Sequence, residues 1–210
     1  MSLKTRTRVK ICGLTCVEDA LMVAQSGADA IGLVFYKPSP RHIEIDQACS
    51  IAKALPAFVT KTALFVNPQV DYVKSVLENV QIDLLQFHGD ESPEFCSQFG
   101  LPYIKAIRMQ SNTHLNDLAE HYASCCGLLL DAYKPGVPGG TGEQFNWDWV
   151  PKSLSKPIIL AGGLTADNVQ KAIRTVQPWA VDVSGGVEAS KGVKSIEKVN
   201  LFMQQINETH

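Results

Sequence analysis

Short apolar runs of strand length alternate with segments of helical periodicity along this chain, and this alternation restricts its fold more than any other feature. We count eight strand-then-helix units at roughly 25-residue spacing. Runs such as 30–35 are apolar throughout, which is typical of parallel strands covered on both faces. Eight units favour a parallel sheet closed into a (β/α)8 TIM barrel over a doubly wound sheet. No change in composition divides residues 1–210, so we predict a single domain.

The predicted elements follow from hydrophobic period and from glycine and proline punctuation. The strands are predicted at 8–12, 30–35, 61–66, 84–87, 102–107, 127–131, 157–160 and 180–183. The helices are predicted at 17–25, 45–55, 70–77, 92–99, 115–122, 147–150, 166–176 and 196–206. Thr15 and Thr165 stand where the N-caps of the helices that follow them are expected.

Polar residues gather where the predicted strands end, whereas the strand interiors are mostly apolar. In order along the chain they are Cys12, Arg41, His88, Arg108 and Asp131, followed by two glycine pairs. In a barrel all eight carboxyl ends meet at one rim, where catalytic groups collect. The sequence therefore predicts one site at this rim.

The two glycine pairs predict a phosphate-binding site. Gly162-Gly163 follows the seventh predicted strand, and Gly185-Gly186 follows the eighth. In barrels these two loops commonly bind phosphate, because glycine lets backbone N–H groups approach the anion. Ser184 offers a hydroxyl beside them. Tight turns without a ligand are the alternative, but two pairs in these two loops favour a phosphorylated small molecule.

Cys12 and Asp131 end the first and sixth predicted strands and would face each other across the barrel mouth. A thiol and a carboxyl so placed suit proton transfer, in which one group takes a proton and the other gives one. The carboxyl must then hold a proton near neutral pH, which burial beside a negative sulfur favours. A buried packing cysteine and a loop carboxylate remain the ordinary alternatives, so position alone leaves the assignment open.

Two loops could complete the site. Arg41 follows two prolines, and a guanidinium on such a stiff loop suits a carboxylate held by two parallel hydrogen bonds. A solvated surface arginine is an equally good interpretation. The glycine-rich loop 133–143, which follows Asp131 directly, suggests a lid that excludes water, or else a loop that is merely mobile.

Composition excludes several partners. The net charge is -2, from 19 basic and 21 acidic residues without a basic stripe, so nucleic acid and anionic membranes are not expected. No apolar run is long enough to span a bilayer. The six cysteines form no C-x-x-C pair and no signal peptide is apparent, so we expect reduced thiols in the cytoplasm. Cys12 and Cys16 lack enough neighbouring ligands for zinc, so we predict no metal site.

Taken together, these motifs resemble the phosphoribosylanthranilate isomerase family. The matching segments are VKICGLT at 9–15, FYKPSPR at 35–41, QFHG at 86–89, LDAY at 130–133, GGTG at 139–142, LAGGL at 160–164 and VDVSGGVE at 181–188. The resemblance runs from about residue 8 to residue 206 without a gap. It implies the Amadori rearrangement of N-(5-phosphoribosyl)anthranilate in tryptophan biosynthesis.

The resemblance also implies the residue roles. Asp131 would be the general acid and Cys12 the general base, while Arg41 would bind the anthranilate carboxylate. Asp182 corresponds to a supporting acidic position. The remaining expected substrate-binding residues are His88, Gly140, Gly142, Gly162, Gly163, Ser184, Gly185 and Gly186. No cofactor is implied, because the nitrogen of the substrate is the electron sink. The only expected partner is the phosphorylated substrate, and the protein would be a monomer or homodimer.

Two alternatives follow from the same pattern. The related isomerase of histidine biosynthesis shares the chemistry but uses two aspartates, so Cys12 argues against it. A catalytically silent barrel that binds sugar phosphates would keep the glycine loops but would not need a matched Cys12 and Asp131.

Overall fold

The computed structural model describes residues 6–132 and 144–209, and its centre is a closed barrel of eight parallel strands in the order β1 to β8. The barrel strands are β1 (Arg8–Cys12), β2 (Ala30–Val34), β3 (Thr60–Phe65), β4 (Leu84–Phe87), β5 (Tyr103–Met109), β6 (Gly127–Ala132), β7 (Ile158–Leu160) and β8 (Ala180–Val183). Each strand pairs with its neighbour in sequence, and β8 closes the ring on β1. The predicted (β/α)8 barrel is therefore confirmed.

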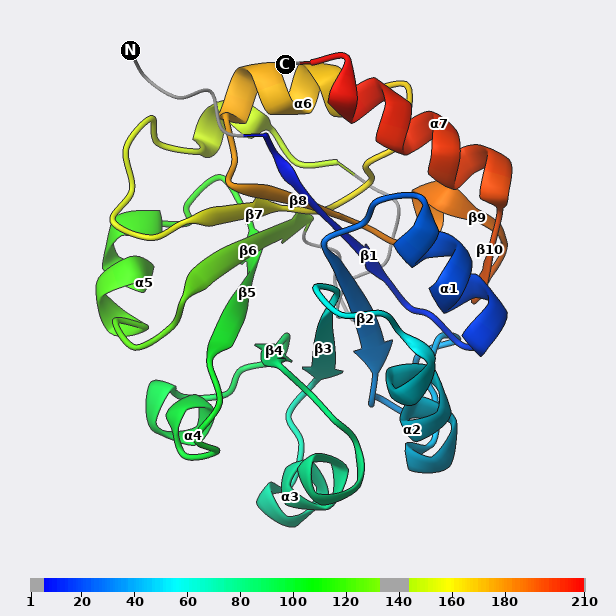
Figure 1. Cartoon of the computed structure of the whole chain (residues 1–210). Coiled ribbons are helices and arrows are strands. Elements are labelled where there is room, and N and C mark those ends of the chain that lie inside the picture. The colour runs from blue at the N-terminus through cyan, green and yellow to red at the C-terminus, as the bar shows by residue number, and fades with distance from the viewer. Residues whose placement is uncertain (1–5, 133–143, 210) are drawn as a thin grey trace.

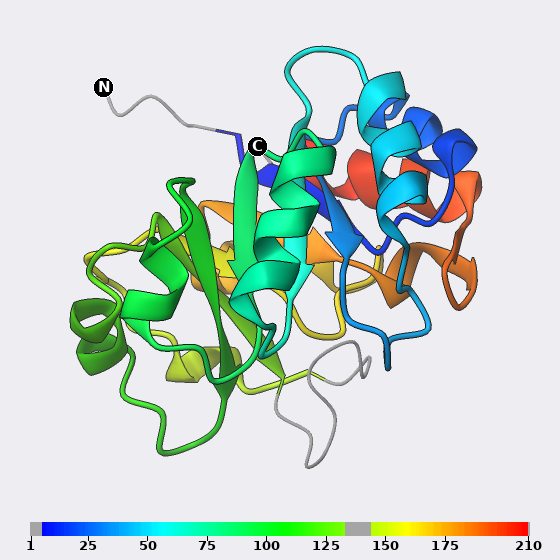
Figure 2. The same ribbon diagram turned by 90° about the horizontal axis from the view of Figure 1, so that it is seen from below.

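Helices cover the outside of the strand ring (Figures 1 and 2). They are α1 (Val17–Gln25), α2 (Ile45–Ala54), α3 (Val70–Asn79), α4 (Pro93–Ser97), α5 (Leu115–His121), α6 (Val169–Val176) and α7 (Ile196–Asn207). Among its described residues, the sixth unit carries only a 3-10 turn, η1 (Trp147–Trp149), where a short helical segment was predicted. No helix within the described residues is long and apolar enough to cross a membrane.

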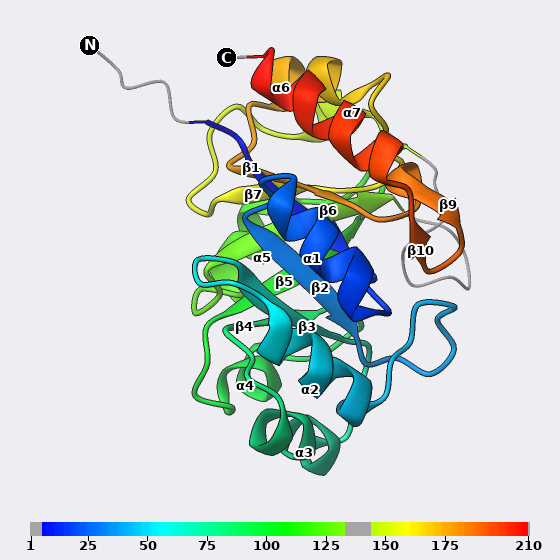
Figure 3. The ribbon, with the colours of Figure 1, turned by 45° about the vertical axis from the view of Figure 1, so that its right-hand side comes forward.

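The loop between β8 and α7 contains structure that the sequence did not predict. It holds a 3-10 turn, η2 (Gly185–Val187), and a small antiparallel hairpin of β9 (Glu188–Ser190) and β10 (Val193–Lys194). Figure 3 shows this hairpin beside α1 at the edge of the barrel. Strands of two and three residues are too short to display a period of two, which explains the omission.

Both predicted N-cap residues were wrong. Helix α1 begins after Cys16, and Thr15 instead donates its hydroxyl to the Gly192 carbonyl at 2.6 Å. Helix α6 begins only at Val169, after Asn168. The Asn168 side chain accepts from Thr165 N–H at 2.9 Å and donates to the Gly163 carbonyl at 2.8 Å. An asparagine that bonds the loop on both sides competes with helix formation, so the predicted first turn stays non-helical.

Apolar residues fill two separate spaces, one between the strands and the helices and one inside the barrel. The inner cluster contains Ile104, Ala106, Leu129, Ile159, Ala161 and Ala180. Alternate residues of a strand point to opposite faces, so each barrel strand contributes to both spaces. Lys10, Thr62, Gln86 and Asp182 are polar residues buried on the barrel strands. The site lies above this partly polar interior.

Candidate active site

A pocket of about 430 Å³ opens at the carboxyl ends of the barrel strands. Ten of the twelve predicted site residues line it, namely Cys12, Arg41, His88, Asp131, Gly162, Gly163, Asp182, Ser184, Gly185 and Gly186. The other two, Gly140 and Gly142, lie outside the described residues, as does the expected lid at 133–143. Residues from distant parts of the sequence thus meet in one concave site, as the barrel topology requires.

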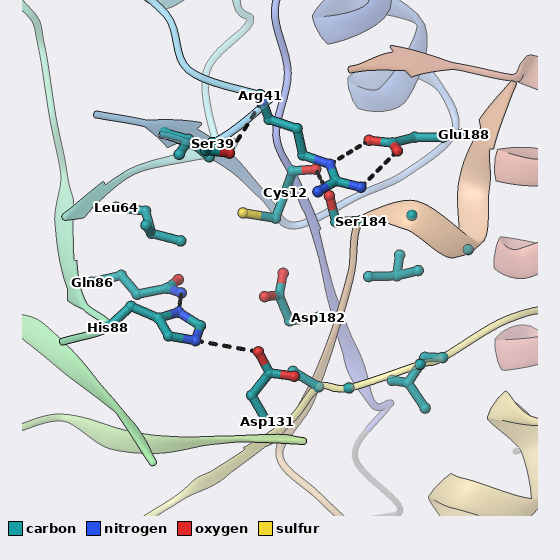
Figure 4. Close-up of a pocket in the computed structure, with 18 of the residues that line it drawn as sticks. Cys12, Ser39, Arg41, Leu64, Gln86, His88, Asp131, Asp182, Ser184 and Glu188 are labelled. Carbon is teal, nitrogen blue, oxygen red and sulfur yellow. Dashed lines mark hydrogen bonds and ion pairs between the residues drawn. The ribbon is translucent and has the colours of Figure 1, made fainter. Parts of the chain in front are cut away.

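Cys12, at the end of β1, is only 6% exposed and directs its sulfur into the pocket (Figure 4). A Cβ atom at Gly32 on the neighbouring strand would lie 2.5 Å from the sulfur, so a side chain there would displace it. The Cys12 carbonyl accepts from Ser184 Oγ at 2.9 Å and from Lys194 Nζ at 2.7 Å. Burial raises the pKa of the Cys12 thiol, whereas the positive charges of Lys10 and Lys194 oppose that rise.

A buried ion pair lies close to the sulfur. Lys10 Nζ donates to Asp182 Oδ1 at 2.9 Å, and both side chains are buried. Burial acts to lower the pKa of Lys10, but the negative charges of Asp182 and of a Cys12 thiolate outweigh it and raise that pKa. For Asp182, burial outweighs the attraction of Lys10 and raises the pKa. Lys10 therefore supplies a fixed positive charge next to the thiol, which the sequence pattern did not indicate.

Asp131, at the end of β6, is held by His88 and by its own backbone rather than by the sulfur. Its Oδ1 accepts from the Ala132 N–H at 2.8 Å, and its Oδ2 lies 3.2 Å from His88 Nε2. Gln86 Nε2 lies 3.1 Å from the other imidazole nitrogen, Nδ1. Figure 4 shows Cys12 and Asp131 pointing into the pocket from different sides, with Asp182 between them in that view. Both groups therefore line the same pocket.

Arg41 is already paired on one edge of its guanidinium. Its Nε and Nη2 donate to the two oxygens of Glu188 at 2.7 and 2.8 Å. Glu188 also accepts from Lys194 Nζ at 2.9 Å. Glu188 therefore occupies the side-on position of the guanidinium, formed by Nε and Nη2. A ligand carboxylate can still bind end-on at the outer edge of the group. The side-chain hydrogen bond to Glu188 is the main cause that raises the pKa of Arg41.

Glu188 and Lys194 were not predicted as site residues, although Glu188 ends the segment 181–188. Burial acts to raise the pKa of Glu188, but Arg41 and Lys194 outweigh it, and the pKa falls below its ordinary value. The partners of Glu188 are 147 and 6 residues away in sequence, so no local spacing signals the cluster. The hairpin β9–β10 brings Glu188 and Lys194 to the mouth.

The glycine loops after β7 and β8 pack against each other at the pocket wall. Gly162 has a φ of +82°, a conformation that favours glycine, and a Cβ there would lie 2.8 Å from the Ala132 nitrogen. A Cβ at Gly186 would collide with the Leu164 carbonyl. Side chains at these positions are therefore excluded, and backbone groups form this part of the wall. Such a wall suits a phosphate group.

Arg108 was wrongly grouped with the rim residues of the site. Strand β5 extends to Met109, two residues beyond its predicted end, so Arg108 belongs to the strand and does not follow it. Its Nη2 donates to Asp90 Oδ1 at 2.5 Å, and it lines a different surface hollow with Gln110 and His114. Among the described residues, no group of three or more His, Cys, Asp or Glu side chains is arranged to hold a metal ion.

Comparison with known proteins gives consistent matches over nearly the whole chain. A family model described as N-(5'phosphoribosyl)anthranilate (PRA) isomerase matches residues 9–205. A protein of Nitrosococcus oceani named N-(5'-phosphoribosyl)anthranilate isomerase is 55% identical over 202 residues, which cover 96% of this chain and 98% of that protein. One of Azotobacter vinelandii with the same name is 55% identical over 199 residues, covering 95% and 97%.

Solved structures give the same result. The phosphoribosyl anthranilate isomerase of Thermus thermophilus superposes with a TM-score of 0.89 at 32% identity, covering 97% of this chain and 100% of that one. The Thermotoga maritima enzyme superposes with a TM-score of 0.84 at 36% identity, covering 96% and 99%. A further structure, with a TM-score of 0.82 at 34% identity and 96% and 99% coverage, is a complex with reduced 1-(o-carboxyphenylamino)-1-deoxyribulose 5-phosphate.

Proposed function

The chain belongs to the N-(5'-phosphoribosyl)anthranilate isomerase family, and from that premise we propose a mechanism in which Cys12 is the general base and Asp131 the general acid. The protein is an isomerase of tryptophan biosynthesis. Its reaction is an Amadori rearrangement, in which an aminoaldose becomes an aminoketose. The two ends of the substrate carry a phosphate and a carboxylate.

The reaction needs one proton donor and one proton acceptor on the sugar. Asp131 gives its proton to the furanose ring oxygen, the C1–O bond breaks, and the substrate nitrogen forms a Schiff base at C1. Cys12, as the thiolate, then takes the proton from C2. The C2–H electron pair moves into the C1–C2 bond while the C1=N pair returns to nitrogen, which gives an enolamine. The enolamine tautomerises to the ketone, so no atoms are gained or lost and no cofactor is needed.

Two features of the site support the base role. The Cys12 sulfur is largely buried at the pocket wall, and burial raises its pKa, so the thiolate is a stronger base once it forms. Lys10 and Lys194 offset part of the cost of that negative charge. Because burial raises its pKa, we expect Cys12 to react with iodoacetamide more slowly than the exposed Cys126 at neutral pH. The substitution Lys10→Met removes a positive charge that favours the thiolate and should slow the reaction of Cys12 further.

The two charged ends of the substrate are assigned to different residues of the pocket. We assign the phosphate to Ser184 and the glycine pairs 162–163 and 185–186, whose loops form one wall. The free edge of Arg41 receives the anthranilate carboxylate, with Glu188 fixing its orientation. His88 holds Asp131, and Asp182 lies between the acid and the base in the view of Figure 4. Roles for Gly140 and Gly142 stay predictions.

Other assignments also stay predictions. We propose that the protein works in the cytoplasm, as a monomer or a homodimer. One solved structure is of monomers generated from the dimeric phosphoribosylanthranilate isomerase of Thermotoga maritima, so a dimer is described for that relative.

The observation that carries the mechanism is that a buried thiol from β1 and a carboxyl from β6 line the same pocket. The test is an assay of the fluorescence decay of phosphoribosylanthranilate with wild type, Cys12→Ser and Asp131→Asn. Each variant should lose about 10²–10⁴-fold in kcat, while its affinity for a phosphorylated product analogue stays near the wild-type value. Cys126→Ser, at an exposed thiol, is the matched control and should keep full activity.

Two outcomes would contradict the proposal, and a third would indicate a different defect. Wild type without turnover would leave a silent sugar-phosphate barrel. A Cys12→Ser variant with wild-type kcat would exclude the sulfur as the base. Loss of analogue binding together with turnover would indicate a defect of folding or binding instead.

A further inference from the structure

Gln86 is the least explained polar residue of the pocket. It lies on β4, is fully buried, and its amide end points into the pocket beside Leu64 and His88 (Figure 4). Its amide nitrogen lies 3.1 Å from His88 Nδ1. Its amide oxygen, Oε1, is buried and has no hydrogen-bond partner among the described residues. Buried acceptors are almost always bonded in native proteins, so an open one at a binding pocket indicates a donor supplied by the ligand.

The nitrogen of Gln86 determines the state of His88. An amide NH₂ only donates, so Nδ1 of the imidazole must accept. The proton of a neutral His88 is then on Nε2, which lies 3.2 Å from Asp131 Oδ2. With the opposite tautomer, a lone pair would face the carboxylate. Gln86 therefore favours the tautomer with its proton on Nε2, the imidazole nitrogen nearer to Asp131, although Nε2 makes no hydrogen bond within the described residues.

The chemistry of the substrate restricts what can reach the oxygen. Phosphate and carboxylate groups of the substrate are acceptors and cannot satisfy another acceptor. The donors of the substrate are its sugar hydroxyls and its amine N–H, and the hydroxyls belong to the part of the substrate that must lie between Cys12 and Asp131. This step rests on the proposed function, because it uses the substrate of the family.

We propose that Gln86 is a two-sided binding and positioning residue, whose Oε1 accepts from a secondary hydroxyl of the sugar while its Nε2 fixes the His88 tautomer against Asp131. The two roles use different atoms, so substitutions can separate them. Gln86→Glu keeps the acceptor and loses the donor. Gln86→Met has similar length and loses both. Thr62→Val is the matched control, because Thr62 Oγ1 is another buried atom without a partner among the described residues, on the adjacent strand β3, but it does not line the pocket.

The first measurement is binding of the reduced product analogue named in the solved complex, and of its versions lacking the hydroxyl at C2 or at C3. In wild type one of the two deoxy versions should bind about tenfold to a hundredfold more weakly, because the buried acceptor is left open. Gln86→Glu and Thr62→Val should keep this discrimination, and Gln86→Met should lose it. Equal binding of all three ligands to wild type, or full discrimination in Gln86→Met, would overturn the hydroxyl contact.

The second measurement is the ¹⁵N NMR spectrum of the imidazole groups. The chain has five histidines, and the His88 signal is identified by its loss in His88→Gln. Wild type should carry the His88 proton on Nε2, and Gln86→Glu should move it to Nδ1. A wild-type proton on Nδ1 would overturn the positioning role. Neither measurement needs turnover, so failure of this inference is distinct from failure of the proposed mechanism, which wild-type activity tests.

Discussion

The two sides of the pocket are built on different principles. On the β1/β8 side, defined here as Lys10, Cys12, Asp182, Glu188 and Lys194, each charged side chain has an oppositely charged partner. On the β4/β6 side, defined as Gln86, His88 and Asp131, a chain of polar groups links three side chains near the strand ends and leaves one acceptor open.

The β1/β8 side is suited to holding side chains in fixed positions, whereas the β4/β6 side is suited to exchanging protons. Paired buried charges are costly to disturb, so the β1/β8 side can hold the sulfur and Arg41 in fixed positions. The β4/β6 side joins a carboxyl to an imidazole, the side chain that most readily exchanges a proton near neutral pH, as a proton-transfer site requires.

Breaking the Lys10–Asp182 pair should have the largest effect on folding. Lys10→Met leaves Asp182 buried without its positive partner, and such a loss costs about 3 kcal/mol of the free energy of unfolding. The double variant Lys10→Met/Asp182→Leu removes both charges and should recover most of that loss. Urea denaturation at pH 8 measures both. If the single variant were as stable as the double variant, the pair would not fix this side of the pocket.

Substitutions of His88 test whether the β4/β6 side takes part in proton transfer. His88→Ala removes the N–H that faces Asp131 Oδ2 and should lower kcat by ~10²-fold, a typical contribution of a group that assists proton transfer. His88→Gln can still present an N–H near the Nε2 position but cannot hold an extra proton. Steady-state kinetics of the two variants separate the roles. If His88→Gln keeps a kcat near that of wild type, His88 only orients Asp131. If both variants lose kcat equally, His88 itself takes part in proton transfer.

A substitution of Glu188 tests whether the β1/β8 side holds Arg41 in position. Glu188→Gln weakens the bidentate contact with Arg41 and leaves Lys194 without its negative partner. We expect KM to rise by roughly tenfold with little change in kcat, because substrate and transition state share the carboxylate contact. Glu197→Gln, at an exposed position in the first turn of α7, should change neither. A fall in kcat at constant KM would instead place Glu188 at the reacting atoms.

The sequence was sufficient for the barrel and for the residues that end its strands. Period and punctuation gave β1, β4, β8 and α1 with the bounds that the structure has, because each is a clear apolar pattern between breakers. The strand ends of a barrel meet at one rim, so placing the elements also placed Cys12, His88 and Asp131. The local pattern did not indicate, however, that the Asp131 carboxyl would lie beside His88.

What the sequence could not supply was the pairing of charges across long separations. Lys10 meets Asp182 from 172 residues away, and Arg41 meets Glu188 from 147 residues away. In β1, Lys10 alternates with apolar residues, and its side chain is buried beside Asp182 in the closed barrel. Helix caps failed for a similar reason. A local pattern indicates that a residue suits a cap, but Thr15 finds a better acceptor at Gly192 through the tertiary fold.

The smallest expected effect is the pH dependence of the free energy of unfolding that arises from two carboxyls of the β1/β8 side. Glu188 has a lowered folded pKa, because Arg41 and Lys194 outweigh burial. Its stabilisation is present above the unfolded pKa of about 4.3 and is lost as the pH falls through the folded pKa. Asp182 has a raised pKa because of burial, so its contribution to stability is present at low pH and is lost as the pH rises through the folded pKa.

Unfolding free energies measured from pH 7 to pH 3 should therefore show that the difference between wild type and Glu188→Gln shrinks as the pH falls. The difference between wild type and Asp182→Asn should change in the opposite direction. Parallel curves for the two variants would mean that these carboxyls titrate alike, and the charge pairing would then not distinguish this side from the other.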